Sequence, residues 1–523
     1  MWTKWGRGGD SLTRRSYLGF VVVVALGVLV AACGSSSSRP AVAPSVSGSW
    51  PYPNADLANT RAASGSTISS KNVARLQQAW TFTLSGTAAS GVSAYGSLAA
   101  APVVENGVVY IQDLDSNVYA LTLSTGKLKW KYKVNLPEKT GPGPDGVAVV
   151  DGAVYGDSST SAFALSAATG KPIWRNADLL SKGQGSFEIQ PQVANGRVYL
   201  ASAYGSGPGG GVLFALDAST GRLLWRFNTM LGEGAGVQAI GAGAGGAWET
   251  PLVSRDGSVT FGIGNPYQSA AAAIAHPSPE LYSDSDVNLD AATGKLRWYY
   301  QGVTNDFKDY DMQASPISAR VNGVSMVLGA GKMGYVYAMD AETGRLIWKT
   351  PVGEHNGHDD DSLLALEHRS TTIRAPYSFL PGALGGVLTN MAVAGDSLYV
   401  STIDSEFTLT SLRQVDGNPT HTPTGEVEAL NLGTGKVEWD TKLSQMALGA
   451  TTVSNDLVFT TLYNGVLIAL DRATGAIVYR HDLPAATNAP IAIAGNTVLV
   501  PAGAPTLFGL AGGHPQLVAY TAP

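Results

Sequence analysis

The chain has 523 residues, of which 44% are hydrophobic, 14% are charged and 63 are glycine. This apolar, weakly charged composition excludes a disordered, collagen-like or coiled-coil protein, and the net charge of -6 argues against nucleic acid as a partner. The single cysteine excludes a disulfide scaffold, a cysteine-based zinc site and a Cys-x-x-Cys-His haem attachment.

Residues 1–32 have the features of an export signal peptide. Arg14 and Arg15 precede an apolar run from Leu18 to Ala32, which is shorter than the about 20 residues that a membrane span needs. The run ends in Val30-Ala31-Ala32-Cys33, which resembles a lipobox, where an exported protein is cleaved and its new N-terminal cysteine receives lipid. The alternative is a chance cysteine in a signal anchor.

The segment Thr13 to Leu18 also resembles a twin-arginine signal, whose substrates cross the membrane already folded. Residues 33–48, rich in Ser, Pro and Ala, indicate a flexible tether behind the lipidated cysteine. We therefore expect residues 49–523 to form an exported body, which the lipid holds on the outer face of the cytoplasmic membrane.

One phrase recurs along this body. Its pattern is Ala/Asn-x-x-x-x-Thr-Gly-x-x-x-Trp, first complete at Ala120–Trp130, and Tyr479 replaces the tryptophan in the last copy. A second phrase, Pro-x-Val-x-x-Gly-x-Val-Tyr, precedes several copies, as in Pro102–Tyr110. Each repeat thus holds four short β-rich runs separated by turn residues. The Thr-Gly glycines are Gly126, Gly170, Gly221, Gly294, Gly344, Gly435 and Gly475.

The repeat predicts an all-β propeller made of four-stranded antiparallel blades. The Thr-Gly turn joins the third and fourth strands of a blade, and the tryptophan packs its outer strand on the next blade. Seven copies are complete. An eighth is split between Gln516–Tyr520 and Ala79–Phe82, so we expect eight blades in a ring that the two terminal strands close. Seven blades remain an alternative if one repeat has degenerated.

These repeats resemble those of the pyrroloquinoline-quinone (PQQ) dehydrogenases over nearly the whole body. The stretch from Trp50 to Arg61, followed by Val73 to Trp80, is similar to that family's N-terminus. The chain also resembles PQQ-binding-like propeller lipoproteins. The repeat alone does not imply the cofactor, because outer-membrane assembly lipoproteins carry similar repeats and bind none.

Strand direction predicts which residues share one face of the propeller. Inner strands begin near the axis, and three residues before the strand proline stand Glu188, Trp248 and Gln313. The loops after the second strands add Asn265 and Lys332, and the long insertions at 227–247, 265–285 and 353–386 fall on the same face. Loops on a rigid scaffold commonly carry function, so we expect these residues to line a central funnel.

The resemblance gives five residues expected roles. It implies that Trp248 forms a flat floor under the quinone, that Asn265 is a metal-ligating amide, and that Asp309 is the catalytic base. Lys332 resembles the cation near the reactive carbonyl, with catalytic and cofactor-binding roles. Asp311 is similar to an extra acid of the lanthanide-using branch. The implied cofactors are PQQ and a hard cation, Ca²⁺ or a lanthanide.

The chain also departs from that family. The family's metal-ligating glutamate aligns near Ser206, and its adjacent-cysteine disulfide is impossible here. By symmetry Glu188 is able to substitute as a metal ligand, which is an inference from position and not a family match. Gln313, on the same face, is expected to bind the cofactor.

Simpler interpretations stand beside these roles. Trp248 is equally able to be a packing residue at the hub, and Asp309 with Asp311 a solvated turn. If residues 309–311 are extended, both acids point to one side and Tyr310 to the other. His355-Asn-Gly-His358-Asp-Asp-Asp361 has metal-binding side chains, although an exposed acidic loop is the alternative that we favour.

The sequence therefore predicts a lipid-anchored PQQ-dependent dehydrogenase that oxidises an alcohol or a sugar outside the cytoplasm. Without a haem motif, its electrons pass to a separate acceptor. The alternative is a propeller without catalysis that serves as a binding or assembly scaffold at the cell envelope. The absent glutamate favours the scaffold, whereas Trp248, Asn265, Asp309, Asp311 and Lys332 favour the enzyme.

Overall fold

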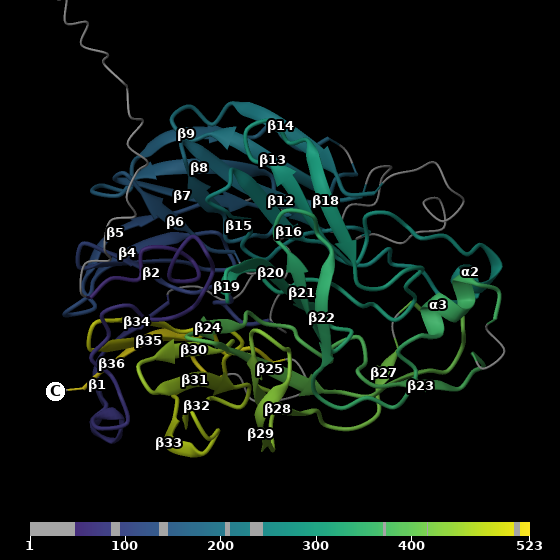
Figure 1. Ribbon diagram of the computed structural model, residues 1–523. Helices are drawn as coiled ribbons and strands as arrows, with labels where there is room; N and C mark the ends of the chain where they lie inside the picture. Colours follow the sequence, from purple (N-terminus) through teal and green to yellow (C-terminus); the bar gives the residue numbers. More distant parts are fainter. Residues whose placement is uncertain are drawn as a thin grey trace, which may run out of the picture. The chain divides into compact units, whose positions relative to one another are not determined.

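The computed structural model describes nine stretches of the chain, all in the unit Ser45–Pro523 (Figure 1). The expected signal peptide, Cys33 and most of the tether lie outside them. No helix among the described residues is both long and apolar enough to cross a membrane. The stretches are 48–84, 95–134, 145–181, 183–203, 210–230, 244–369, 373–415, 417–506 and 513–522.

Antiparallel sheets of four main strands recur in chain order through these residues, as expected for propeller blades. We number them sheets 1 to 8. Sheet 1 holds β2 (Val103–Glu105), β3 (Val108–Gln112), β4 (Val118–Thr122) and β5 (Leu128–Tyr132), and sheet 2 holds β6 (Ala148–Val150), β7 (Ala153–Ser158), β8 (Ser161–Ser166) and β9 (Pro172–Asn176). Sheet 3 holds β10 (Ser186–Phe187), β11 (Gln192–Ala194), β12 (Arg197–Ala203), β13 (Val212–Asp217) and β14 (Leu223–Asn228), and sheet 4 holds β15 (Leu252–Val253), β16 (Ser258–Gly262), β17 (Ser285–Asp290) and β18 (Leu296–Gln301).

The second half of the chain continues the series. Sheet 5 holds β19 (Ile317–Val321), β20 (Val324–Gly331), β21 (Tyr335–Asp340) and β22 (Leu346–Pro351), and sheet 6 holds β24 (Ala392–Ala394), β25 (Ser397–Asp404), β28 (Thr424–Asn431) and β29 (Val437–Leu443). Sheet 7 holds β30 (Thr452–Ser454), β31 (Leu457–Leu462), β32 (Val466–Asp471) and β33 (Ile477–Asp482). Sheet 8 holds β34 (Ala492–Ala494), β35 (Thr497–Ala502) and β36 (Gln516–Thr521), together with β1 (Gln77–Thr83) from the other end of the chain.

The pairing of the two terminal strands was predicted from the split repeat and is confirmed. β1 runs antiparallel to β36, with Phe82 opposite Leu517 and Thr83 opposite Gln516. Figure 1 shows the purple β1 beside the yellow β36. Both edges of β36 are therefore hydrogen-bonded, one to β1 and the other to β35.

The repeat tryptophans join neighbouring sheets, as the sequence predicted. The Trp130 side chain donates from Nε1 to the backbone oxygen of Ala167 at 2.9 Å, and its ring covers Gly170 of the next sheet. Gly170 has φ +70°, and a Cβ atom placed there would lie 2.5 Å from Cε3 of Trp130. Trp80 of β1 makes the same contact with Gly126 and donates to Leu123 at 2.7 Å. Only glycine therefore meets both requirements of the turn.

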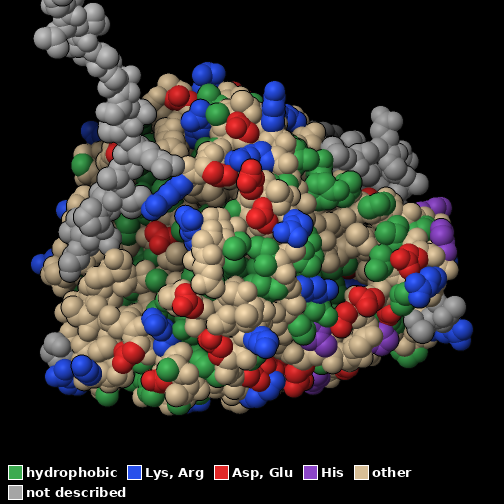
Figure 2. All heavy atoms as spheres, viewed as in Figure 1, with side chains coloured by type: hydrophobic (Ala, Val, Ile, Leu, Met, Phe, Trp, Pro, Cys, Tyr) green, Lys and Arg blue, Asp and Glu red, His purple; other side chains and the backbone are tan. Residues whose placement is uncertain are grey.

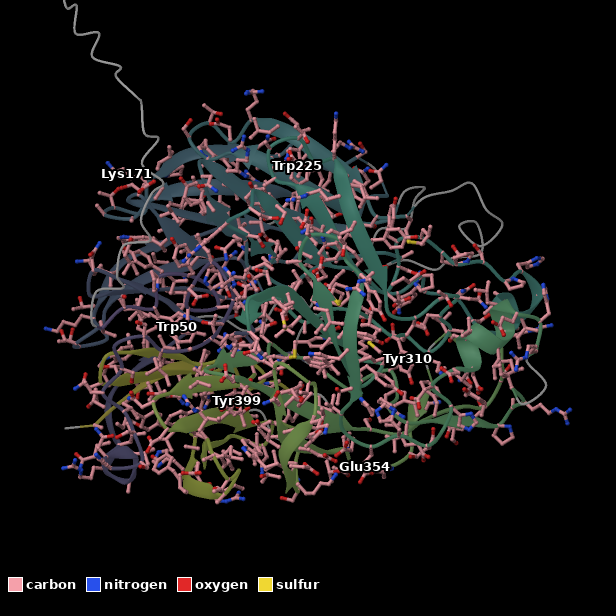
Figure 3. The ribbon with its side chains drawn as sticks, in the orientation of Figure 1. Trp50, Lys171, Trp225, Tyr310, Glu354 and Tyr399 are labelled. Atoms are coloured by element: carbon pink, nitrogen blue, oxygen red, sulfur yellow. The ribbon has the colours of Figure 1, made fainter. Side chains whose placement is uncertain are left out.

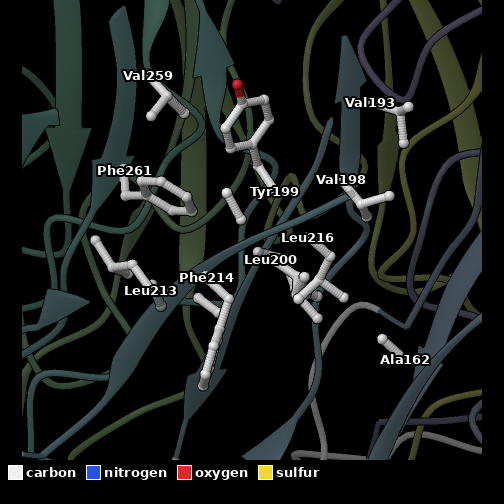
Figure 4. Packing of buried hydrophobic residues seen from close by; sticks show 14 of the residues in the cluster. Ala162, Val193, Val198, Tyr199, Leu200, Leu213, Phe214, Leu216, Val259 and Phe261 are labelled. Atoms are coloured by element: carbon white, nitrogen blue, oxygen red, sulfur yellow. The ribbon is translucent and has the colours of Figure 1, made fainter. Parts of the chain in front are cut away.

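Between these contacts, apolar side chains of successive sheets share a core. One cluster combines residues of sheets 2, 3 and 4, among them Tyr199, Phe214 and Phe261 (Figure 4). The β-branched and aromatic content of the strands suits them to this pleated packing. The core therefore runs from sheet to sheet and leaves the strand ends free to carry polar groups.

The N-terminal segment ties several sheets together from one side. Trp50 pairs with Val104 of sheet 1 and lies among the strands in Figure 3. Arg61 is fully buried and donates to the backbone oxygens of Thr451 at 2.9 Å and Ile491 at 2.8 Å. These two residues directly precede the first strands of sheets 7 and 8. A buried guanidinium with this many acceptors fixes the segment in place.

The two long insertions that the structure describes, at 265–285 and 353–386, form additional elements outside the eight sheets. They contain the short helices α2 (Ala270–Ala275) and α3 (Asp361–Leu366), which lie side by side in Figure 1. β23 (Tyr377–Phe379) joins β26 (Phe407–Leu409) and β27 (Asn418–Pro419) in a small three-stranded sheet beside them. One 3-10 turn, η1 (Val73–Arg75), precedes β1.

Candidate functional site

The loop that carries the expected base is shaped by a buried acid. The carboxylate of Asp306 accepts the backbone N–H of Lys308 at 3.0 Å and that of Tyr310 at 2.8 Å. Asp309 consequently takes a left-handed conformation, with φ +63°. The extended conformation considered for residues 309–311 is therefore not adopted at this residue. Tyr310, labelled in Figure 3, donates its hydroxyl to the backbone oxygen of Pro381 at 2.7 Å.

The two acids nevertheless face one cation, the ammonium group of Lys332. Its Nζ lies 2.8 Å from Oδ2 of Asp309 and 2.6 Å from Oδ2 of Asp311. All three side chains are at least seven-eighths buried, with exposed fractions of 9%, 12% and 4%. Burial alone would lower the pKa of Lys332, but the two carboxylates outweigh it and raise that pKa well above its usual value. Lys332 is thus held charged, as predicted, and the solvated-turn interpretation of the acids is wrong.

The backbone explains why Lys332 reaches this position. Lys332 directly follows β20, and its N–H donates to the backbone oxygen of Asp311 at 3.0 Å. A Cβ atom at Gly331 would collide with that same oxygen. The glycine therefore lets β20 approach the acidic loop closely enough for the ion pairs to form.

Asn265 completes this cluster from the end of sheet 4. Its backbone N–H donates to Oδ1 of Asp311 at 2.9 Å, and its side-chain amide donates to Oδ1 of Asp309. Asn265 has a side-chain oxygen and the two acids have carboxylate oxygens, which are the ligand atoms that a hard cation prefers. By this chemistry the residues fit such an ion, and an ion bound there would share the carboxylates with Lys332.

Trp248 adjoins the same cluster. A Cβ atom at Gly264 would lie 3.1 Å from Cη2 of Trp248 and 2.7 Å from Oδ1 of Asp311. The indole and the carboxylate therefore both lie close to this glycine. Trp248 is partly buried. A flat aromatic ring beside charged groups is a surface on which a planar ligand stacks.

For two predicted residues, Glu188 and Gln313, the described contacts are with other groups than Lys332, Asp309 and Asp311. Glu188 is buried and accepts a hydrogen bond from the Ser186 hydroxyl at 2.6 Å, and its charge raises the pKa of Asp145 and Asp157. Its described contacts therefore lie between sheets 2 and 3. Gln313 donates from Nε2 to the backbone oxygen of Leu388 at 2.8 Å. Their roles toward metal and cofactor stay predictions.

Sequence reasoning missed a further acid, Asp284, which lies beside the cluster. Asp284 is fully buried, and its N–H donates to the backbone oxygen of Gly264 at 3.0 Å. Burial, followed by the charges of Asp306 and Asp311, raises its pKa well above the usual value. Asp284 precedes β17 in an alternating polar stretch, and no local pattern distinguishes it from a solvent-facing strand residue. Ser206, the position of the absent glutamate, lies outside the described residues.

The His355–Asp361 loop forms internal pairs. Nδ1 of His355 lies 2.7 Å from Asp359, and Nδ1 of His358 lies 2.8 Å from Asp361. Asp361 is buried, and Lys308 donates to the backbone oxygen of His358, whereas Asn356 and Asp360 are exposed, so the favoured interpretation as an exposed acidic loop holds for part of the segment. Figure 2 shows acidic and histidine side chains gathered on the side that carries α3. No group of three or more His, Cys, Asp or Glu in the described stretches is arranged ready for a metal.

Sequence comparisons assign the chain to a family. Residues 50–372 match the family profile "Glucose/ethanol/alcohol dehydrogenase, beta-propeller domain", which is more than half of the chain. The chain therefore belongs to this family of β-propeller proteins, as the resemblance predicted. Residues 423–514 match the profile "Outer membrane protein assembly factor BamB".

Individual relatives are more distant. The chain is 33% identical over 279 residues to a lupanine 17-hydroxylase [cytochrome c] of Pseudomonas sp., which covers 47% of this chain and 40% of that protein. It is 27% identical over 308 residues to the quinoprotein alcohol dehydrogenase PedH of Pseudomonas putida, covering 53% and 50%. The chain thus spans about half the length of these curated relatives or less.

Solved structures share the fold. A europium-containing methanol dehydrogenase superposes with a TM-score of 0.72 at 19% identity, covering 91% of this chain and 98% of that one. At this identity the likeness supports an all-β propeller with four-stranded antiparallel sheets, and it carries no further conclusion about the site.

Proposed function

We propose that this protein is a PQQ-dependent dehydrogenase that oxidises an alcohol or sugar hydroxyl. One observation carries the proposal: Asn265, Asp309, Asp311 and Lys332 are joined by direct hydrogen bonds and ion pairs next to the partly buried Trp248. They come from different sheets, and chance surface residues do not converge in this way.

The residues divide the work of the reaction. Asp309 accepts the hydroxyl proton of the substrate, and the Lys332 ammonium keeps this carboxylate ionised for the task. Asn265 orients Asp309 by donating to its other oxygen. Trp248 offers the flat surface on which a planar group stacks. When bound, PQQ would accept the hydride from the carbinol carbon, and the hard cation would polarise its carbonyl.

Asn265, Asp309 and Asp311 are the residues that would hold the cation, and Ca²⁺ or a trivalent lanthanide suits their oxygen atoms. The names of the relatives support this assignment, since PedH is a quinoprotein alcohol dehydrogenase and one structural neighbour contains europium. The substrate alcohol and a separate electron acceptor follow as partners.

We also propose the finer architecture and the location. The eight sheets of four or five strands in the described residues, with β1 paired to β36, support a closed ring of eight blades over residues 49–523. Residues 1–32 serve as the signal peptide, and residues 33–48 are the lipidated Cys33 with its tether. The lipid then anchors the protein on the outer face of the cytoplasmic membrane.

The test is an absorbance titration of the purified protein with PQQ, in the presence of Ca²⁺ or a lanthanide, followed by a dye-linked assay on alcohols and sugars. We expect saturable binding, and we expect Asp309→Asn to lose activity at least about 100-fold. The control is Asp178→Asn, which changes an exposed carboxylate and should leave activity unchanged.

The scaffold is the second candidate, favoured by the match of residues 423–514 to an assembly-factor profile. If the wild-type protein binds no PQQ with either ion present, the dehydrogenase proposal fails. The scaffold then takes its place, and its test is the capture of envelope proteins on the same face.

A further inference from the structure

The loop of residues 305–311, which carries the two acids of the proposed site, is bound to its surroundings on more than one side. Its acids form the ion pairs with Lys332. At its start, Asn305 is fully buried and donates its side-chain amide to the backbone oxygens of Ala273 at 3.2 Å and Ser362 at 3.4 Å. These oxygens belong to α2 and α3, so the loop is attached to both insertions that the structure describes.

Lys308 makes a further contact with the second of these insertions, at 353–386. Its side chain is fully buried, and its ammonium group donates to the backbone oxygen of His358. The ammonium nitrogen also lies 5.0 Å from the ring centroid of Tyr310 and 5.7 Å from that of Phe307, which is within the range of a cation–π contact. A buried lysine gives up the hydration of its ammonium group, which is costly, so the position needs an explanation other than packing.

The acceptor of Lys308 is itself held by other groups of the insertion. Nδ1 of His358 lies 2.8 Å from Oδ2 of Asp361, and the same carboxylate oxygen accepts the Tyr377 hydroxyl at 2.8 Å. The rings of His358 and Tyr377 meet edge to face, with their centroids 5.0 Å apart. The Tyr377 ring also packs on Phe307 of the loop, at 5.9 Å between centroids. Lys308 therefore donates to a carbonyl whose position is fixed by several contacts.

These contacts flank the expected base along the chain. Asp306 accepts the backbone N–H groups of Lys308 and Tyr310, which closes the turn around Asp309. The side chains of Lys308 and Tyr310 both donate to backbone oxygens of the second insertion. Asp309, between them, contacts Lys332 instead. A displacement of Lys308 would therefore move the backbone that carries the carboxylate of the base.

We propose that Lys308 is a positioning residue for Asp309, and that its bond to the His358 carbonyl fixes the acidic loop to the insertion at 353–386. The inference rests on the proposed function, in which Asp309 accepts the substrate proton. Lys308 acts through the backbone of the loop and not on the reacting atoms. Small displacements of a catalytic group are expensive, because the reacting atoms must meet within a narrow range of distances. The insertion thus sets the position of the base and of Asp311, which the same loop carries.

The experiment compares Lys308→Met with Lys308→Arg. Methionine keeps a long unbranched side chain and removes the donor, whereas arginine keeps a charged donor. The dye-linked assay gives kcat and KM of the PQQ-loaded protein. In parallel, Tb³⁺ luminescence measures lanthanide binding to the PQQ-free protein, and the part of the signal that Asp309→Asn removes is assigned to the proposed site.

We expect Lys308→Met to lower kcat about 100-fold, to leave KM within about threefold of the wild type, and to weaken Tb³⁺ binding at this site about tenfold. Lys308→Arg should recover most of both losses. The control Leu499→Ala shortens a fully buried side chain of sheet 8 and lowers stability away from the site. Its kcat and Tb³⁺ affinity should match the wild type below its thermal midpoint.

A folded Lys308→Met with unchanged kcat and Tb³⁺ affinity refutes the proposal. So does an equal loss in Leu499→Ala without recovery by arginine, because instability alone then explains both. If Lys308→Met does not fold, Tyr377→Phe carries the comparison: it removes the hydroxyl bound to Asp361, and unchanged Tb³⁺ binding refutes the proposal. A wild type that binds Tb³⁺ through Asp309 but oxidises no alcohol or sugar refutes the dehydrogenase alone, since the Tb³⁺ comparison still tests Lys308. A wild type that does neither refutes both.

Discussion

The contact between a repeat tryptophan and the next Thr-Gly turn predicts the effect of a single methyl group. Gly170→Ala places a Cβ atom 2.5 Å from Cε3 and 2.7 Å from Cδ2 of Trp130, at a residue with φ +70°. Gly152→Ala, in the same sheet, meets a φ of +76° with no atom within 4 Å of the new Cβ. The two variants share the backbone strain and differ in the contact.

The two costs are separable. A left-handed conformation costs a residue with a side chain about 1–2 kcal/mol, which is the whole effect expected for Gly152→Ala. Overpacking against a rigid indole adds about 1–3 kcal/mol, so Gly170→Ala should lose about 2–5 kcal/mol. The indole is unable to move aside freely, because its Nε1 is hydrogen-bonded to Ala167 at 2.9 Å.

Urea denaturation followed by tryptophan fluorescence measures the difference. A body of this size need not unfold in one step, so the comparison uses the midpoint of the first transition in each variant. Gly170→Ala should lower that midpoint clearly more than Gly152→Ala. Equal midpoints would show that the tryptophan contact contributes nothing to joining the sheets.

Five other results are expected. Deleting residues 516–523 removes β36, which is paired on both edges, and should lower the thermal midpoint by more than about 10 °C; an unchanged midpoint contradicts ring closure. Cys33→Ser should move the protein out of the membrane fraction, and unchanged partition would rule out the lipid anchor. Asp309→Ala should abolish dye-linked activity at an unchanged midpoint, and Asp311→Ala should weaken lanthanide use more than Ca²⁺ use, which a side-by-side metal titration checks. Glu249 is raised in pKa from 4.5 to about 7, mainly by burial, with Asn390 and Arg61 opposing. Because the folded pKa lies above the unfolded one, stability is full below pH 4.5 and falls by at most about 3 kcal/mol as pH rises to 7; Glu249→Gln should flatten this fall, and a profile identical to the wild type would refute the assignment.

The sheets were predictable because their signal is local and repeated. Trp130 and Gly170 belong to successive copies of one sequence repeat, and the same tryptophan–glycine contact recurs between neighbouring copies. The β1–β36 pairing followed from the same phrase, since Trp80 supplied the one strand that the C-terminal copy lacked. A repeat thus reveals its own packing without any knowledge of distant contacts.

The lateral neighbours of the site residues were harder to predict. Repeat symmetry correctly places Glu188 and Trp248 at equivalent positions of sheets 3 and 4, but it does not say toward which neighbouring sheet a side chain turns. Glu188 acts on Asp145 and Asp157, while Trp248 adjoins Asp311. Asp284 gave no signal at all, because it lies in the long insertion at 265–285, which no repeat describes.

At Asp309 the backbone conformation differs from an extended strand, although the two acids still face one group. An extended strand would have aligned its carboxylate with that of Asp311, and the left-handed turn that Asp306 stabilises does not have this geometry. The two acids still meet, because Lys332 arrives from the end of sheet 5 and its ammonium binds both. Residue type thus predicted the pairing better than backbone shape did, since a buried carboxylate that lacks a counter-charge is too costly to keep. The same reasoning distinguishes the two acidic groups of this protein. Asp309 and Asp311 have their lysine, whereas Asp145 and Asp157 have no salt-bridge partner in the described part of the chain, and burial raises the pKa of both well above the usual value.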